Sequence, residues 1–128
     1  MGNVTTDKGY FEFYMGKEVA PGGYVWIFPK GPNMANVGIG VCGRYTRRRS
    51  STDYLDAFIE EHLPNSTPLG MIVGSVPVAY TLDDIVTDGL MVVGDAARMV
   101  NPSTGGGIAQ AMTAGEIAGK IAGEAIEK

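Results

Sequence analysis

The sequence predicts an α+β fold in which an antiparallel sheet is followed by a strand–loop–helix segment. Three runs rich in β-branched and aromatic residues lie between Tyr10 and Cys42, separated by glycine and proline. One helical pattern follows, and a long alanine- and glycine-rich helical pattern closes the chain. The 128 residues are enough to build one hydrophobic core.

The three runs predict a meander of strands at 10–14, 24–28 and 35–42. The first connection is predicted as a turn at 20–23, where alanine and proline precede two glycines. The second is predicted as a turn at 29–33, which contains two prolines and a glycine.

The central strand has two different faces. Because side chains alternate along a strand, Tyr24, Trp26 and Phe28 share one face. Val25 and Ile27 share the other. The aromatic face could line an apolar ligand, or it could be core packed against the helix that follows.

Two glycines mark the third strand. Gly38 and Gly40 fall on the face opposite Val37 and Ile39. A strand glycine leaves room for a close approach. That room could serve a ligand, or it could relieve the packing of Trp26 across the strands.

The second half of the chain mixes helices and short apolar runs. A helix is predicted at about 50–63, with a hydroxyl residue as its cap and Pro64 after its end. A strand interrupted by proline is predicted within 71–80. Residues 90–93 are all apolar, which predicts a strand covered on both faces. Residues 107–127 predict a long helix.

Bulk composition excludes several classes of protein. The net charge of −4 argues against a nucleic-acid-binding protein. The single cysteine argues against a disulfide framework and favours a reducing, cytoplasmic location. His62 has no companion residue that would suggest a second metal ligand, so no metal site is predicted.

Gly94 and Asp95 directly follow the apolar run at 90–93. Ligands of open α/β sheets bind at the carboxyl ends of strands, and a carboxylate there can accept a hydrogen bond from a sugar-alcohol hydroxyl. Asp95 could instead only cap the turn that continues through Ala96 and Ala97.

A glycine loop precedes the last helix. Pro102 opens this loop, and Gly105, Gly106 and Gly107 close it. Glycines at a helix start expose backbone N–H groups at the positive end of the helix dipole. Such groups can stabilise a phosphate or the electron-rich edge of a reduced ring system.

These motifs resemble a known family. G-D-A-A-R at 94–98 and P-S-T-G-G-G at 102–107 resemble the flavin-ribityl motif of para-hydroxybenzoate-hydroxylase-like flavoproteins. Y-V-W-I-F-P at 24–29, followed by G-I-G at 38–40, is similar to a motif of geranylgeranyl reductases. Those enzymes saturate isoprenoid double bonds in archaeal lipids and in chlorophyll side chains.

The resemblance implies part of an FAD/NAD(P)-binding α/β flavoprotein. Residues 1–88 would belong to a substrate-binding antiparallel sheet domain, and residues 89–128 would be the C-terminal part of the FAD-binding domain. Family members open with a G-x-G-x-x-G motif that holds the ADP half of FAD. No such motif follows a leading strand here, so we expect an internal fragment with an incomplete FAD site.

The resemblance also implies residue roles. The expected cofactor-binding residues are Gly94, Asp95, Pro102, Gly105, Gly106 and Gly107. The expected residues of the prenyl-chain cavity are Tyr24, Trp26, Phe28, Pro29, Gly38 and Gly40. Tyr24 is also the one candidate for a proton donor.

The function expected from the resemblance is FAD-dependent reduction of geranylgeranyl chains in archaeal-type lipid biosynthesis. The partners would be a prenyl lipid, which could bring the protein to a membrane, and an electron donor that the residues do not identify. One alternative is a flavin-dependent monooxygenase or halogenase, which uses a similar flavin segment. Another, for the isolated chain, is a folded non-catalytic fragment that carries no flavin and self-associates through exposed sheet edges.

Overall fold

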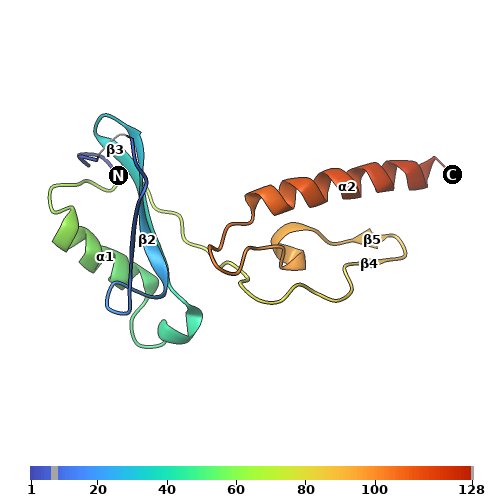
Figure 1. Cartoon of the computed structure of the whole chain (residues 1–128), viewed down its shortest axis with the longest axis horizontal. Coiled ribbons are helices and arrows are strands. Elements are labelled where there is room, and N and C mark those ends of the chain that lie inside the picture. Colours follow the sequence, from blue (N-terminus) through green and yellow to red (C-terminus); the bar gives the residue numbers. More distant parts are fainter. Residues whose placement is uncertain (7–8, 128) are drawn as a thin grey trace. The chain divides into compact units, whose positions relative to one another are not determined.

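The computed structural model describes residues 1–6 and 9–127. The chain forms two compact units, Met1–Ile72 and Val73–Lys128, which we call the first and the second unit (Figure 1). The boundary near residue 88 expected from the family resemblance concerns domains of a larger flavoprotein, and it stays a prediction.

The first unit is built on a three-stranded antiparallel sheet. Its strands are β1 (Glu12–Gly16), β2 (Ala20–Gly31) and β3 (Met34–Gly40), in the order β1-β2-β3. The predicted meander is therefore confirmed. A short 3₁₀ helix, η1 (Gly43–Tyr45), and helix α1 (Ser51–His62) follow the sheet.

The turn predicted at 20–23 is wrong. Ala20 already pairs with Gly16, so the turn between β1 and β2 occupies residues 17–19. The glycines serve a different purpose, because a Cβ on Gly23 would overlap the backbone carbonyl of Gly40. Gly23 thus allows β2 and β3 to approach closely rather than making a turn.

The turn predicted at 29–33 is shorter than expected. Pro29 pairs with Ala35 within the sheet, and only residues 32–33 form the turn. The pairing of β2 with β1 reaches no further than Ile27 in this direction. At Pro29 the strand thus has a neighbour on one side only, so its missing N–H breaks no bond to β1.

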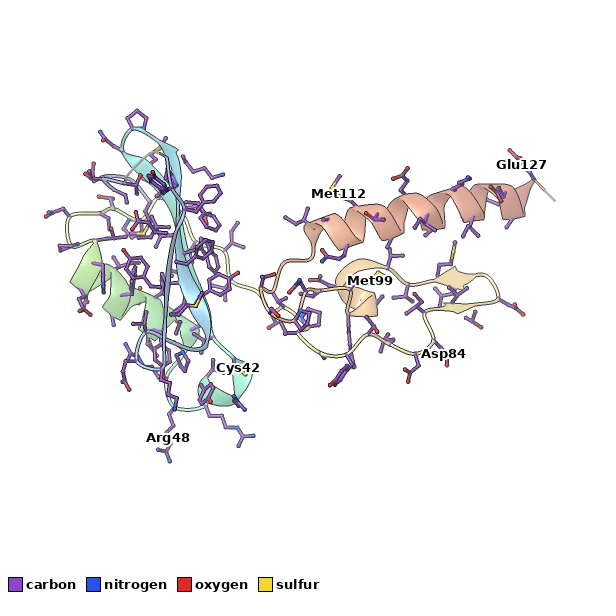
Figure 2. All side chains as sticks on the ribbon, in the orientation of Figure 1. Cys42, Arg48, Asp84, Met99, Met112 and Glu127 are labelled. Carbon is purple, nitrogen blue, oxygen red and sulfur yellow. The ribbon has the colours of Figure 1, made fainter. Side chains whose placement is uncertain are left out.

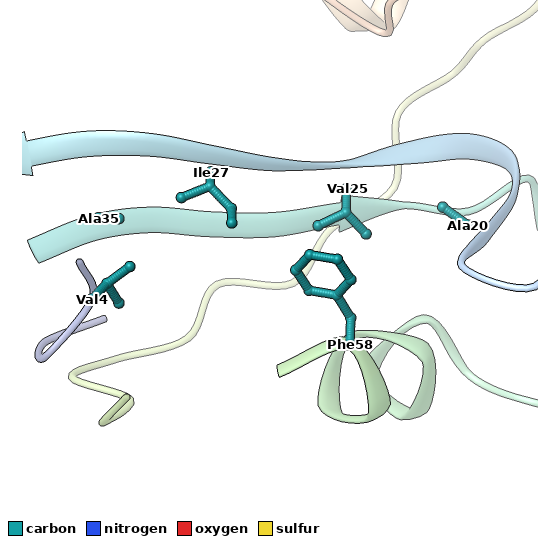
Figure 3. Close-up of a cluster of buried hydrophobic side chains, with 6 residues drawn as sticks. All are labelled: Val4, Ala20, Val25, Ile27, Ala35 and Phe58. Carbon is teal, nitrogen blue, oxygen red and sulfur yellow. The ribbon is translucent and has the colours of Figure 1, made fainter. Parts of the chain in front are cut away.

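The core of the first unit lies between the sheet and α1 (Figure 3). Val25 and Ile27 are 0% and 2% exposed, and Phe58 of α1 packs beneath them. Val4, Ala20 and Ala35 complete this cluster. The predicted division of β2 into a face with Val25 and Ile27 and a face with the three aromatic side chains is confirmed, and the structure shows that the first of these is the core face.

Helix α1 begins with a capping box. The Asp53 N–H donates to Ser50 Oγ at 3.1 Å, and the Ser50 N–H donates to Asp53 Oδ2 at 2.9 Å. Hydrogen bonding of the Asp53 carboxyl, first with the Ser50 side chain and then with the Ser50 backbone N–H, holds its pKa below the ordinary value. The helix predicted at 50–63 is confirmed.

The second unit consists of a hairpin and a long helix. The hairpin pairs β4 (Val86–Thr87) with β5 (Leu90–Met91). A 3₁₀ helix, η2 (Gly94–Ala97), follows, and helix α2 runs over Ile108–Ile126. The long C-terminal helix predicted at 107–127 is therefore confirmed.

The strand predicted within 71–80 is wrong. This stretch is irregular. Two backbone hydrogen bonds between residues two apart bend it around Pro77: Val78 N–H donates to Val76 O, and Ala79 N–H donates to Pro77 O, each at 2.9 Å. Ile72 is 99% exposed. Apolar character alone does not make a strand, and no described segment pairs with this one.

The prediction that residues 90–93 are covered on both faces is also wrong. The strand is limited to two residues, and Leu90 remains 56% exposed. Among the described residues it pairs with β4 alone. Likewise, no described residue of α2 is buried, and Met112 projects from α2 on the side away from the hairpin (Figure 2).

Candidate functional site

The sheet of the first unit carries five aromatic side chains on the side opposite the core, and we call this surface the aromatic face. It consists of Phe11, Phe13, Tyr24, Trp26 and Phe28. Phe13 of β1 pairs directly with Trp26 of β2 in the sheet register. The Phe13 ring centroid lies 5.5 Å from the centroids of both Tyr24 and Phe28.

Sequence reasoning had missed Phe11 and Phe13. The signal was present, because alternation places both on the face of the first strand opposite Glu12. The alternative that the aromatic face packs against the helix at 50–63 is wrong. Helix α1 covers the Val25 side instead, and Phe13 stays 51% exposed.

The Trp26 indole is held from two sides. Its Nε1–H donates to Asn36 Oδ1 at 2.7 Å. A Cβ on Gly38 would lie 2.6 Å from Trp26 Cε2 and 2.9 Å from Cη2, so the ring occupies the space that a side chain there would need. Gly40 has no such neighbour, because the nearest atom to its Cβ position is Tyr24 O at 4.0 Å. The packing role considered for both glycines therefore fits Gly38 and not Gly40.

The register places the remaining predicted substrate residues on different faces. The Tyr24 ring lies between Phe13 and Trp26, with its centroid 5.9 Å from that of the indole. Pro29 instead pairs with Ala35, a member of the core cluster, and so belongs to the core side of the sheet.

In the second unit, the predicted cofactor residues meet where η2 approaches the start of α2. A Cβ on Gly107 would lie 3.2 Å from Asp95 Oδ1, so the carboxylate stands beside the helix N-terminus. Asp95 is exposed. Gly107 is the N-cap of α2 and brings no side chain, and no described residue caps this end through its side chain. The first-turn N–H groups and the carboxylate thus offer donors and an acceptor side by side.

Backbone conformation explains two of the glycines. Gly94 and Gly105 have φ angles of +65° and +72°, in the region that favours glycine. Arg98 also adopts a left-handed conformation, with φ of 55°, and its N–H closes the turn by donating to Asp95 O at 2.9 Å.

The glycine loop is ordered by Asn101. Its Oδ1 accepts from the N–H groups of Ser103 and Thr104 at 2.9 and 3.1 Å. Its backbone N–H donates to Gly106 O, and its carbonyl accepts from the Gly105 N–H. Hydrogen bonds among its own residues thereby hold the loop in this conformation.

An open pocket of about 760 Å³, lined in part by this loop, lies within the second unit. Pro102 is the one predicted cofactor residue that lines it. The other lining residues are Thr81, Met99, Val100, Asn101, Ala109, Gln110, Thr113, Ala114 and Ile117. Val100 lines the pocket, and its side chain also lies 3.4 Å from the Cβ position of Gly107. The pocket and the Asp95–Gly107 pair are therefore neighbours.

Two other features are absent from the part of the chain that the structure describes. Within it, no group of three His, Cys, Asp or Glu side chains is placed to hold a metal ion. No helix of that part has the length and apolar character needed to cross a bilayer.

The fold is that of part of a geranylgeranyl reductase-like flavoprotein. A geranylgeranyl bacteriochlorophyll reductase-like protein from Thermoplasma acidophilum has a similar structure, with a TM-score of 0.89 and 46% sequence identity. The match covers 98% of this chain and 32% of that one. Residues 1–76 match the geranylgeranyl reductase catalytic domain, and the chain belongs to this family.

Curated relatives agree with this assignment. A digeranylgeranylglycerophospholipid reductase of Methanosarcina acetivorans is 52% identical over 94% of this chain and 30% of its own length. Digeranylgeranylglycerophospholipid reductase 2 of Methanococcoides burtonii is 49% identical over 98% of this chain and 31% of its own length. The chain thus spans about a third of the length of the curated relatives it matches.

Proposed function

We propose that this chain is part of an FAD-dependent reductase that saturates the double bonds of geranylgeranyl chains in archaeal-type membrane lipids. The aromatic face carries this proposal, because it combines the family's strand motif with an exposed apolar surface. The same strand motif favours a reductase over a flavin-dependent hydroxylase or halogenase.

The aromatic face suits a prenyl chain physically. Rings at centroid separations of 4.8 to 6.2 Å form one continuous apolar surface. A ligand without hydrogen-bonding groups gains free energy there by removing apolar area from water. Tyr24 brings the one phenolic hydroxyl of this face, so it is the proposed source of the proton that completes saturation.

The residues of the second unit fit the ribityl and ring portions of a flavin. The Asp95 carboxylate would accept from a ribityl hydroxyl, and the N–H groups around Gly105, Gly106 and Gly107 would face the electron-rich edge of the ring. A side chain at position 107 would fill the space beside Asp95 Oδ1. A glycine at this position keeps that space open for the flavin. Gly94 and Pro102 would shape the two turns that bring these groups together.

When bound, a reduced flavin supplies the hydride for alkene reduction. The protein's own contribution is to orient the flavin and the prenyl chain and to exclude water from them. In the second unit, the N-terminus of α2 would stabilise negative charge on the flavin. In the first unit, the aromatic face would exclude water from the prenyl chain.

A chimera tests the proposal. The matching segment of the complete Methanosarcina acetivorans reductase is replaced by this chain, which shares 52% of its residues over the match. We expect the purified chimera to retain flavin and to add a pair of hydrogens per reduced bond, read from product mass. In the chimera, Gly107→Ala should lower the flavin content, and Phe13→Ala should raise KM while flavin stays bound.

The control is Gly43→Ala, because a Cβ there meets no atom within 4 Å. Tyr24→Phe should lower kcat and leave flavin content unchanged. A folded chimera without flavin would contradict the assignment of the second unit. A flavin-loaded chimera that leaves prenyl chains unreduced would contradict the assignment of the aromatic face.

A further inference from the structure

Trp26 is the residue of the aromatic face whose hydrogen bonding matters most to an apolar ligand. Its indole N–H is a donor without acceptor capacity. When an apolar chain covers the ring, water leaves, and an unpaired donor under the ligand would cost free energy. The structure pairs this donor with Asn36 Oδ1 at 2.7 Å.

Asn36 is placed for this task by the sheet register. It pairs with Phe28 across the β2–β3 ladder, so its side chain shares the aromatic face with the indole. It is itself exposed, and among the described residues its side chain forms a hydrogen bond with Trp26 alone. Neither the family motif nor the sequence reasoning singled out this residue.

Gly38 supplies the second constraint. The indole lies over this glycine, with Cε2 and Cη2 within 2.9 Å of the position a Cβ would take. The indole also neighbours the Phe28 ring, with an interplanar angle of 29° and 6.2 Å between centroids. The ring is therefore pressed against β3 and oriented by its N–H group.

We infer that Asn36 is a positioning residue for the aromatic face: it fixes the Trp26 indole over Gly38 and accepts from the indole N–H, which a prenyl chain would otherwise bury without a partner. This inference rests on the proposed function, because it takes the ligand to be a prenyl chain. It adds a polar residue to a surface otherwise defined by its rings.

The first test needs no ligand. Trp26 is the only tryptophan, so the indole N–H gives a single, unambiguous peak in a proton–nitrogen NMR spectrum of the chain. Asn36→Ala should shift this peak and speed its exchange with solvent. Asn36→Asp keeps an acceptor oxygen at the same position and should preserve slow exchange. Asn33→Ala, in the turn of the same hairpin, is the matched control.

The second test uses geranylgeraniol as the probe, with Trp26 fluorescence as the readout. Asn36→Ala should bind it roughly tenfold more weakly than the wild-type chain, as expected for an unpaired buried donor. Asn33→Ala should bind like wild type. Circular dichroism verifies that each variant keeps its secondary structure.

The outcomes distinguish the role of Asn36 from the assignment of the aromatic face as a prenyl site. A shifted indole peak with weakened binding supports the inference. A shifted peak with unchanged affinity overturns the positioning role and leaves the aromatic face intact as a prenyl site. An unshifted peak in Asn36→Ala overturns the hydrogen bond itself. Failure of the wild-type chain to bind geranylgeraniol overturns the substrate assignment and this inference with it.

Discussion

The two units of this chain differ in how they bury apolar side chains. In the first unit, six residues from the N-terminal segment, the sheet and α1 form one buried cluster. In the second unit, the buried apolar side chains among the described residues are Ala97 and Val100 alone. Both units contain apolar segments, but only in the first unit do apolar side chains from several segments pack into one cluster.

The stability of the chain resides mainly in the first unit. Burial of apolar area is the main favourable term in folding. The first unit therefore has the means to fold by its own contacts. Helix α2 and the β4–β5 hairpin leave large side chains exposed, including Ile108 at 80% and Ile126 at 86%. Their order depends mostly on local backbone hydrogen bonds.

Truncating one apolar side chain in each unit tests this difference in burial with the largest expected effect. Phe58→Ala removes the ring beneath Val25 and should cost about 3–5 kcal/mol. Ile126→Ala, in the second unit, should change stability by less than about 0.5 kcal/mol because that side chain is exposed. Urea unfolding followed by Trp26 fluorescence and by circular dichroism measures both. Equal losses would contradict the account.

A second prediction concerns the two glycines under the aromatic face. Gly38→Ala forces the Trp26 ring out of its place and should destabilise the first unit by about 1–3 kcal/mol, with a changed Trp26 emission spectrum. Gly40→Ala is the matched control, since its Cβ would touch nothing closer than Tyr24 O at 4.0 Å. Thermal unfolding compares the two, and an equally tolerated Gly38→Ala would show that the indole does not rest on β3.

The smallest expected effect is at the start of α1. Ser50→Ala removes the capping hydroxyl and should cost about 1 kcal/mol at neutral pH. Ser51→Ala, one residue later, should leave stability nearly unchanged.

The cap also predicts a dependence on pH. Because the pKa of Asp53 is lowered in the folded state, its contribution is complete above the ordinary carboxyl pKa of about 4. It is lost as the pH falls through the lower folded value. Ser50→Ala removes the main cause of that shift, so stability should fall less steeply in acid. An unchanged acid dependence in the variant would show that the capping box does not titrate as described.

The sheet of the first unit was predictable from sequence because each strand pairs with the strand next to it along the chain. Alternation in β2 correctly separated Val25 and Ile27 from the aromatic side chains, and the order of the strands followed from their spacing. The errors came from glycine and proline. Gly23 looked like a turn residue, but the close approach of Gly40 requires it within the sheet.

The second unit was predictable only in part. Periodicity and the glycine loop correctly located α2, and the structure does bring Asp95 beside Gly107. The predictions for residues 71–80 and 90–93 were wrong for a common reason. An apolar run shows that burial would be favourable, but it does not show which other segment covers it. The Trp26–Asn36 hydrogen bond could not be predicted, since it depends on the exact register of β2 and β3.

Amide hydrogen exchange of the chain, followed segment by segment, tests the division between the two units most directly. The account predicts slow exchange in β1, β2, β3 and α1, and much faster exchange in β4, β5 and α2. Comparable protection in both units would contradict the claim that the first unit alone holds a core.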